Sequence, residues 1–146
     1  MNKGQIFTSL VLEIFKVSGQ LNAEGDQLTA PLGLTSARWK VLGAISLLQA
    51  PQTTSDIARY MGQSRQATQR LVDSMVADGL LELVENPRHK RAKLVNLTAA
   101  GKDAYARLDE KQIPWAQEHA RGLTREELET AFSVLSKLSQ QLNRQG

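Results

Sequence analysis

The sequence predicts a mainly α-helical fold with a small β-hairpin wing: a winged helix-turn-helix lobe flanked by amino- and carboxy-terminal dimerisation helices. Two observations support this fold class. Apolar residues recur at three- and four-residue spacing over long segments at both ends of the chain, which is typical of amphipathic helices. Two shorter amphipathic segments in the middle are separated by a turn at Gly62, and two aliphatic runs around a basic loop follow them.

Length and composition restrict the class of protein further. The chain has 146 residues, about the size of one domain, and we expect a single domain over residues 1–146. Within it, residues 1–30 and 99–146 should form the dimerisation helices and residues 35–98 the winged lobe. The absence of cysteine excludes disulfides, thiolate metal sites and cysteine nucleophiles. No apolar run approaches the roughly 20 residues of a membrane span and no signal peptide is evident, so we expect a cytoplasmic protein without a membrane partner.

The first third of the chain should hold two helices. The apolar spacing predicts one helix over residues 5–25, which ends before Pro31. Thr35 or Ser36 can cap the second helix, which Pro51 closes.

The middle segment predicts the helix-turn-helix and its wing. The stretch Thr53–Asp56 is a capping box for a helix of about two turns, and Gly62 is placed to end it. Ser64 can cap the second helix. The runs LLELV and AKLVNL, at residues 80–84 and 92–97, are short and aliphatic, which favours a β-hairpin.

The carboxy-terminal part should again be helical. Thr98 can cap a long helix that Pro114 should bend or divide, because proline removes a backbone donor. The stretch Thr124–Glu127 is a capping box that opens a final helix with a broad apolar stripe. Such stripes at both ends favour a homodimer interface. The alternative is that the two terminal helices cover one another within a monomer.

The positive charge is concentrated in the middle of the chain. The formal net charge is only +3, but the segment Ser36–Leu97 holds nine Lys/Arg against five Asp/Glu, whereas the remainder is slightly acidic. This distribution is expected if the centre meets phosphate and the flanks serve assembly.

Five residues at the start of the second helix of the turn are predicted to contact double-stranded DNA: Ser64, Arg65, Gln66, Gln69 and Arg70. This helix lies in the major groove in helix-turn-helix proteins. Arg65, Gln66 and Gln69 have the donors and acceptors to read base edges, since arginine suits guanine and glutamine suits adenine. Arg70 lies one turn deeper, where phosphate is the expected partner. For each residue taken singly, the alternative is an ordinary solvated helix position.

The wing loop is the second predicted DNA-contacting segment, with Arg88, His89, Lys90, Arg91 and Lys93 and no acid among them. A narrow minor groove attracts an inserted arginine, which favours Arg91 or Arg88 as the probe. His89 is a candidate pH-dependent contact, because histidine titrates near neutrality. The alternative is a charge run that is merely solvated.

Several short segments, taken in their order and spacing, resemble the MarR family of bacterial winged-helix transcriptional regulators over nearly the whole chain. These segments are Leu34-Thr35, Asp56-Ile57-Ala58, Ser64, Arg70-Leu71-Val72-Asp73, Gly79-Leu80, Asn86-Pro87 to Arg91, and Leu97-Thr98-Ala99-Ala100-Gly101. The resemblance implies a homodimer joined through its terminal helices, with two recognition helices on a pseudo-palindromic operator. It also implies release by a small ligand held between the dimer core and the DNA-binding lobes. We therefore expect a DNA-binding transcriptional regulator that represses by occupying a promoter.

Individual positions agree and disagree with the family pattern. Arg70 matches the recognition-helix arginine, whereas Gln69 stands where the family commonly has threonine. Thr68 stands where a buried aliphatic residue is common, so we expect it to pack rather than to contact DNA. In the wing, the family often has an Asp before two arginines, and His89 occupies the place of that acid. The minor-groove arginine is retained as Arg91.

Other functions have weaker support in the sequence. No nucleophile elbow, phosphate-binding glycine loop, metalloprotease helix or metal-ligand cluster is present, so we expect neither an enzyme nor a cofactor or metal. The competing hypothesis is a ligand-sensing or protein-binding helical dimer that does not bind DNA. A small aromatic effector is a further candidate partner, with a pocket from Phe7, Trp39, Tyr105 and Trp115. The alternative for these aromatic residues is core packing.

Overall fold

A computed structural model describes residues 1–145, with side chains described through residue 143, and it confirms the mainly helical class with a small antiparallel wing. Gly146, the last residue of the predicted domain, lies outside the described residues. The chain divides into two compact units, Met1–Glu110 and Lys111–Gly146. No described helix is both long and apolar enough to cross a membrane.

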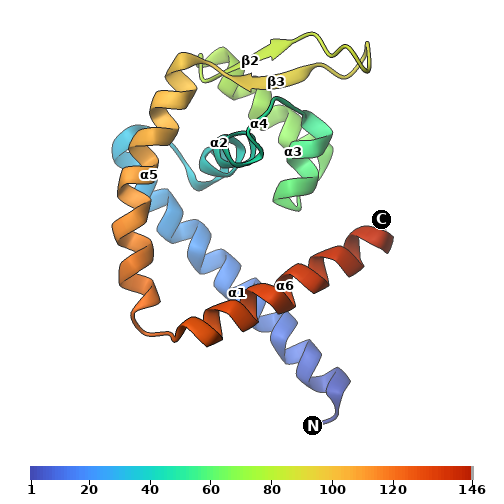
Figure 1. Ribbon diagram of the computed structural model, residues 1–146, viewed down its shortest axis with the longest axis vertical. Coiled ribbons are helices and arrows are strands. Elements are labelled where there is room, and N and C mark those ends of the chain that lie inside the picture. Colours follow the sequence, from blue (N-terminus) through green and yellow to red (C-terminus); the bar gives the residue numbers. More distant parts are fainter. Residues whose placement is uncertain (146) are drawn as a thin grey trace. The chain divides into compact units, whose positions relative to one another are not determined.

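The first unit contains the helix-turn-helix, the wing and the long first helix (Figure 1). Its elements are α1 (Lys3–Thr29), the 3-10 helix η1 (Ala30–Leu32), α2 (Ser36–Leu48), β1 (Gln52–Thr53), α3 (Thr54–Met61), α4 (Arg65–Ala77), β2 (Leu81–Val84), β3 (Leu94–Leu97) and the first half of α5 (Ala99–Ala120). The second unit holds the rest of α5 and α6 (Arg125–Gln145).

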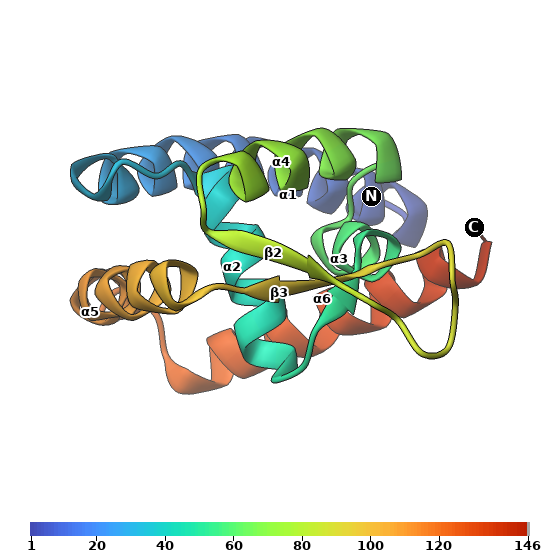
Figure 2. The same ribbon diagram turned by 90° about the horizontal axis from the view of Figure 1, so that it is seen from above.

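The sheet has the strand order β1-β3-β2, with every pair antiparallel. In the hairpin, Leu81 lies opposite Leu97 and Val84 lies opposite Leu94. The loop of this hairpin projects beyond α3 and α4 (Figure 2). Strand β1 was not predicted, because two residues are too short to show an alternating pattern.

Side-chain caps begin the helices where the sequence predicted them. The hydroxyl oxygens of Thr35, Thr53, Ser64 and Thr124 each accept a hydrogen bond from the backbone N–H three residues later. Thr53 and Thr124 belong to complete capping boxes, closed by Asp56 and Glu127. These local bonds fix where α2, α3, α4 and α6 start.

The core of the first unit fixes α4 and the hairpin to α2 and α3. Its largest fully buried apolar side chains come from six elements and are Val41, Leu42, Ile57, Val72, Met75, Leu81, Val95 and Leu108. Burying such a side chain contributes roughly 1.5–3 kcal/mol relative to leaving it exposed. The DNA-facing elements predicted from the sequence therefore share one rigid support.

Of the two effects predicted for Pro114 on α5, division of the helix is wrong and bending stays a prediction. The helix is continuous through Pro114, so the proline does not divide it. A proline removes one backbone donor, and its clash with the preceding turn can be relieved by bending while the turns on either side stay helical.

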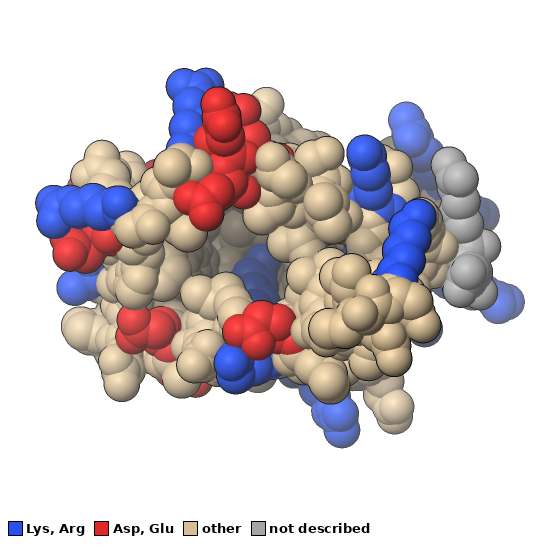
Figure 3. Space-filling view, turned by 90° about the horizontal axis from the view of Figure 1, so that it is seen from below, with Lys and Arg blue, Asp and Glu red and all other residues tan. Residues whose placement is uncertain are grey.

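Both units expose large apolar side chains. On α1 these include Ile6, Phe7, Leu10, Leu12, Phe15 and Leu21, and in the second unit Ile113, Leu123, Leu128, Phe132, Leu135 and Leu142. Figure 3 shows a face on which uncharged residues cover most of the surface and charged side chains are scattered.

Candidate nucleic-acid interface

The turn between α3 and α4 is fixed by hydrogen bonds within residues 58–67. Gly62 adopts a φ of 67°, a left-handed conformation that glycine takes without strain. The N–H of Gln63 donates to the carbonyl of Ala58 at 3.0 Å, which completes the end of α3. The Ser64 hydroxyl then accepts from the N–H of Ala67 at 3.1 Å and starts α4. Ser64 is thus a helix cap, and its contact with DNA stays a prediction.

Helix α4 buries one side and presents the other. Thr68, Val72 and Met75 are fully buried. The Thr68 hydroxyl donates to the carbonyl of Ser64 at 2.9 Å, which satisfies its buried oxygen within the helix. The expected packing role of Thr68 is confirmed. This anchored side holds the opposite face of α4 outward.

The outward face carries the predicted contact residues of the helix. Arg65, Gln66 and Arg70 are exposed, whereas Gln69 is half-buried. The Gln69 side chain donates from Nε2 to Oδ1 of Asp73 at 2.9 Å, one turn further along. One of its N–H groups is therefore engaged on its own helix.

A short network of hydrogen bonds closes the wing loop. The Asn86 side chain donates from Nδ2 to the carbonyl of Ala92 at 2.9 Å, and its Oδ1 accepts from the N–H of Arg88 at 3.0 Å. The N–H of Ala92 donates to Nδ1 of His89 at 3.1 Å. Asn86 and His89 thus bridge the wing loop, and His89 stands where the MarR family, which this sequence resembles, often has an aspartate. The cationic residues Arg88, Lys90, Arg91 and Lys93 are exposed around it.

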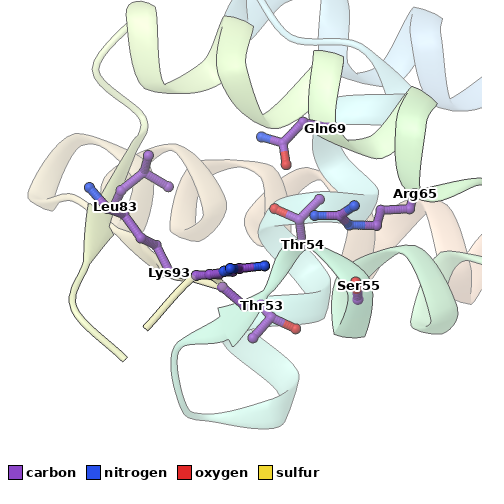
Figure 4. Close-up of a pocket in the computed structure, with 9 residues that line it drawn as sticks. Thr53, Thr54, Ser55, Arg65, Gln69, Leu83 and Lys93 are labelled. Carbon is purple, nitrogen blue, oxygen red and sulfur yellow. The ribbon is translucent and has the colours of Figure 1, made fainter. Parts of the chain in front are cut away.

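A cleft of about 220 Å³ lies where the wing meets the two helices of the turn. Its lining comes from three places: the start of α3, one side of α4 and the base of the wing. The lining residues are Thr53, Thr54, Ser55, Arg65, Gln69, Leu83, Arg91, Ala92 and Lys93. Figure 4 shows Arg65 reaching from α4 towards Thr54, and Gln69 presenting its amide oxygen to the same cleft. Three cationic side chains and no acid line the cleft, so its potential is positive.

The start of α3, which lines part of this cleft, carries opposite charges. Backbone N–H groups in the first turn of a helix have no partner within the helix and carry a partial positive charge. Asp56 caps this end, and burial raises the pKa of its carboxyl. Hydrogen bonds from Thr53 and the nearby Arg59 outweigh burial and hold the pKa of Asp56 below its usual value. The acid is thus ionised at neutral pH, and its negative charge offsets the partial positive charge of the helix start. The positive potential of the cleft therefore comes from Arg65, Arg91 and Lys93.

The sequence did not identify the contribution of α3 to this cleft. Thr53, Thr54 and Ser55 were recognised only as part of a helix start, and the capping box was the signal that could have located them. Conversely, one arginine of the basic middle segment forms a salt bridge within the winged lobe. Nη2 of Arg38 lies 2.6 Å from Oδ2 of Asp78, so this arginine fastens α2 to the end of α4.

The four aromatic residues of the predicted effector pocket do not meet within the first unit. Trp39 and Tyr105 are partly buried against the core, and Trp39 lies beside Gly25 of α1. Phe7 is exposed and lies about 27 Å from Gly25 along α1, at a rise of about 1.5 Å per residue. Trp115 belongs to the second unit, where its ring lies 4.9 Å from that of His119. The effector pocket stays a prediction.

Comparison with known proteins agrees with this architecture. An uncharacterized protein of Mycobacterium tuberculosis is 36% identical over 106 residues, covering 71% of each chain. The transcriptional activatory protein BadR of Rhodopseudomonas palustris is 29% identical over 113 residues, covering 76% of this chain and 65% of BadR. A crystal structure of a MarR mutant from E. coli with operator DNA superposes with a TM-score of 0.79 and 26% identity, covering 94% of this chain and 99% of MarR. The transcriptional regulator BldR from Sulfolobus solfataricus superposes with a TM-score of 0.81 at 21% identity, covering 94% and 99%.

A helix-turn-helix joined to a cationic wing defines the class: this is a winged helix-turn-helix DNA-binding transcriptional regulator. Residues 32–92, which include the turn, α4 and most of the wing, match the model of the MarR family. The chain belongs to the MarR family.

Proposed function

We propose that this chain is a homodimer that binds a pseudo-palindromic operator in double-stranded DNA and represses transcription by occupying a promoter. The observation that carries the proposal is the cleft between α4 and the wing, which cations from both elements line without an acid. With α4 in a major groove and the wing in the neighbouring minor groove, the DNA backbone runs between the two elements. Its phosphates would then lie at this cleft. In the homodimer, two copies of α4 would enter grooves about 34 Å apart.

The proposed contacts divide by their chemistry. Gln66 and Arg65 read base edges, Arg70 holds phosphate, and Arg91 enters the minor groove. The MarR mutant with a TM-score of 0.79 was crystallised with operator DNA, which supports duplex DNA as the partner. Repression follows if the bound protein occupies a promoter. BadR is named as an activatory protein, so the position of the operator would decide whether this chain represses or activates transcription. Release by a small ligand and a cytoplasmic location belong to the same proposal.

The test is duplex binding by fluorescence anisotropy across a range of salt concentrations, with a fragment selected by the protein from random DNA. We expect a steep fall of affinity with salt, because each phosphate contact contributes a slope of about −0.9. Arg91→Ala should lower both the affinity and the slope, the slope by about one contact. Arg107→Ala, an exposed arginine on α5 paired with Asp103, is the matched control and should change neither. If the parent protein fails to bind any duplex in dilute buffer, the proposal is wrong and the helical dimer without DNA binding replaces it.

A further inference from the structure

Asp73 is an acid on the face of α4 that the proposed function turns towards DNA. Gln66, Gln69, Arg70 and Asp73 are spaced as positions 0, 3, 4 and 7 of one helix, so they share a face. The same spacing carries the base-contacting residues of the homeodomain recognition helix. Asp73 is exposed on this face beside the predicted contacts.

The carboxylate of Asp73 differs from the other acids of the helix-turn-helix. Asp56 is 3.3 Å from Arg59, and Asp78 is 2.6 Å from Arg38, so both are paired with a cation. Within the part of the chain whose side chains are described, Asp73 pairs with no lysine or arginine. Its hydrogen bond comes from the neutral Gln69 amide, whose Nε2 lies 2.9 Å from Oδ1. The full negative charge of Asp73 therefore remains on the DNA-facing side.

An unneutralised acid at this position lowers affinity for every duplex, because phosphates repel it. This loss of affinity is offset only at a site where a base donates a hydrogen bond to the carboxylate of Asp73. In the major groove, cytosine presents its N4 amino group, whereas guanine presents two acceptors and thymine presents one. Adenine presents its amino group beside the N7 acceptor, which repels a carboxylate. Cytosine is thus the base that suits Asp73 best.

Resting on the proposed function, we propose that Asp73 is a specificity-determining residue that accepts a hydrogen bond from the amino group of one cytosine in each half-site. Gln69 is its positioning residue. The Gln69 amide engages Oδ1, which fixes the carboxylate and leaves Oδ2 for the base. The half-buried position of Gln69 beside the cleft holds that amide in place.

The experiment selects duplexes from random DNA separately with the parent protein, Asp73→Ala and Asp73→Asn. The parent should recover one conserved C·G pair per half-site, and both variants should lose that conservation while keeping the rest of the site. On the selected operator, replacing that C·G pair by T·A should weaken the parent by roughly 5- to 150-fold and Asp73→Ala by less than about 2-fold. Affinity of Asp73→Ala for random duplex should rise several-fold, because a charge facing phosphate is removed.

Two further variants separate base reading from a general change of charge. Glu85→Gln removes an exposed acid beside the wing and should raise affinity for random duplex without altering the selected sequence. Gln69→Ala should weaken the C·G preference without raising affinity for random duplex. The inference is overturned if Asp73→Ala selects the same sites with the same discrimination as the parent, which would leave the Gln69–Asp73 pair as a helix-stabilising contact. Failure of the parent to retain any duplex would instead overturn the proposed function itself.

Discussion

Gly101 shows how a single residue joins the sheet to α5. A Cβ at this position would lie 2.1 Å from the carbonyl oxygen of Leu80, which is backbone and cannot rotate away. The adjoining Thr98 hydroxyl donates to the carbonyl of Gly79 at 2.6 Å and accepts from the N–H of Gly101 at 3.0 Å. The start of α5 therefore packs directly on the turn that follows α4.

Replacing this glycine should destabilise the protein. We expect Gly101→Ala to lower the free energy of unfolding by about 1–3 kcal/mol, because the backbone must shift to admit the methyl group. The measurement is urea unfolding followed by circular dichroism at a fixed protein concentration. Gly19→Ala is the matched control: nothing lies within 4 Å of a Cβ there, and alanine should stabilise α1 by up to about 1 kcal/mol. Equal stability of Gly101→Ala and the parent would contradict the close approach.

At the scale of elements, the wing depends on its own loop for its shape. Nδ1 of His89 accepts from the N–H of Ala92, which requires that this ring nitrogen carry no proton in the closed loop. With Asn86, this bond holds the two ends of the loop together. The closed loop then places Arg91 at the cleft.

We expect His89→Ala to open the loop and weaken operator binding by roughly 2- to 10-fold, the equivalent of one hydrogen bond of about 0.5–1.5 kcal/mol. His89→Asn should stay within about 2-fold of the parent, because the amide oxygen can accept in place of Nδ1. Anisotropy gives the affinities, and hydrogen exchange of the Ala92 amide in the free protein reports the loop directly. Unchanged exchange at Ala92 in His89→Ala would show that the histidine does not hold the wing.

The elements of this fold could be predicted from the sequence because their signals are local. Caps at Thr35, Thr53 and Ser64, with the stop at Gly62, lie within four residues of the bonds they form. Strand β1 could not be predicted, since it exists only through pairing with β3, some forty residues later.

The candidate site was predictable to a similar extent. Charge density and helical spacing identified the residues of α4 and the wing. The start of α3 joins the cleft only through tertiary packing, and the pairing of Arg38 with Asp78 crosses from α2 to the end of α4. Spacing along the chain carries no signal for either contact.

At the scale of the whole molecule, exposed apolar surface is the feature that calls for a partner. Phe15 on α1 is 68% exposed and Phe132 on α6 is 75% exposed, each within a stripe of further apolar residues. Surfaces of this kind are uncommon on proteins that remain monomeric. In the proposed homodimer, a twofold interface would bury the same apolar stripes on both copies of the chain.

The last prediction concerns Phe132 as a residue of that interface. We expect Phe132→Asp to raise the dimer dissociation constant on the order of 100-fold or more, because two phenylalanines each lose roughly 1.5–3 kcal/mol of burial and two carboxylates would need desolvation. Sedimentation velocity over a range of concentrations measures this, and circular dichroism checks that the helices remain. Thr130→Asp is the control, since a residue two positions away points to the opposite side of α6 and is exposed there. A parent protein that sediments as a monomer at every concentration would contradict the dimer, and the apolar stripes would then have to be covered within one chain.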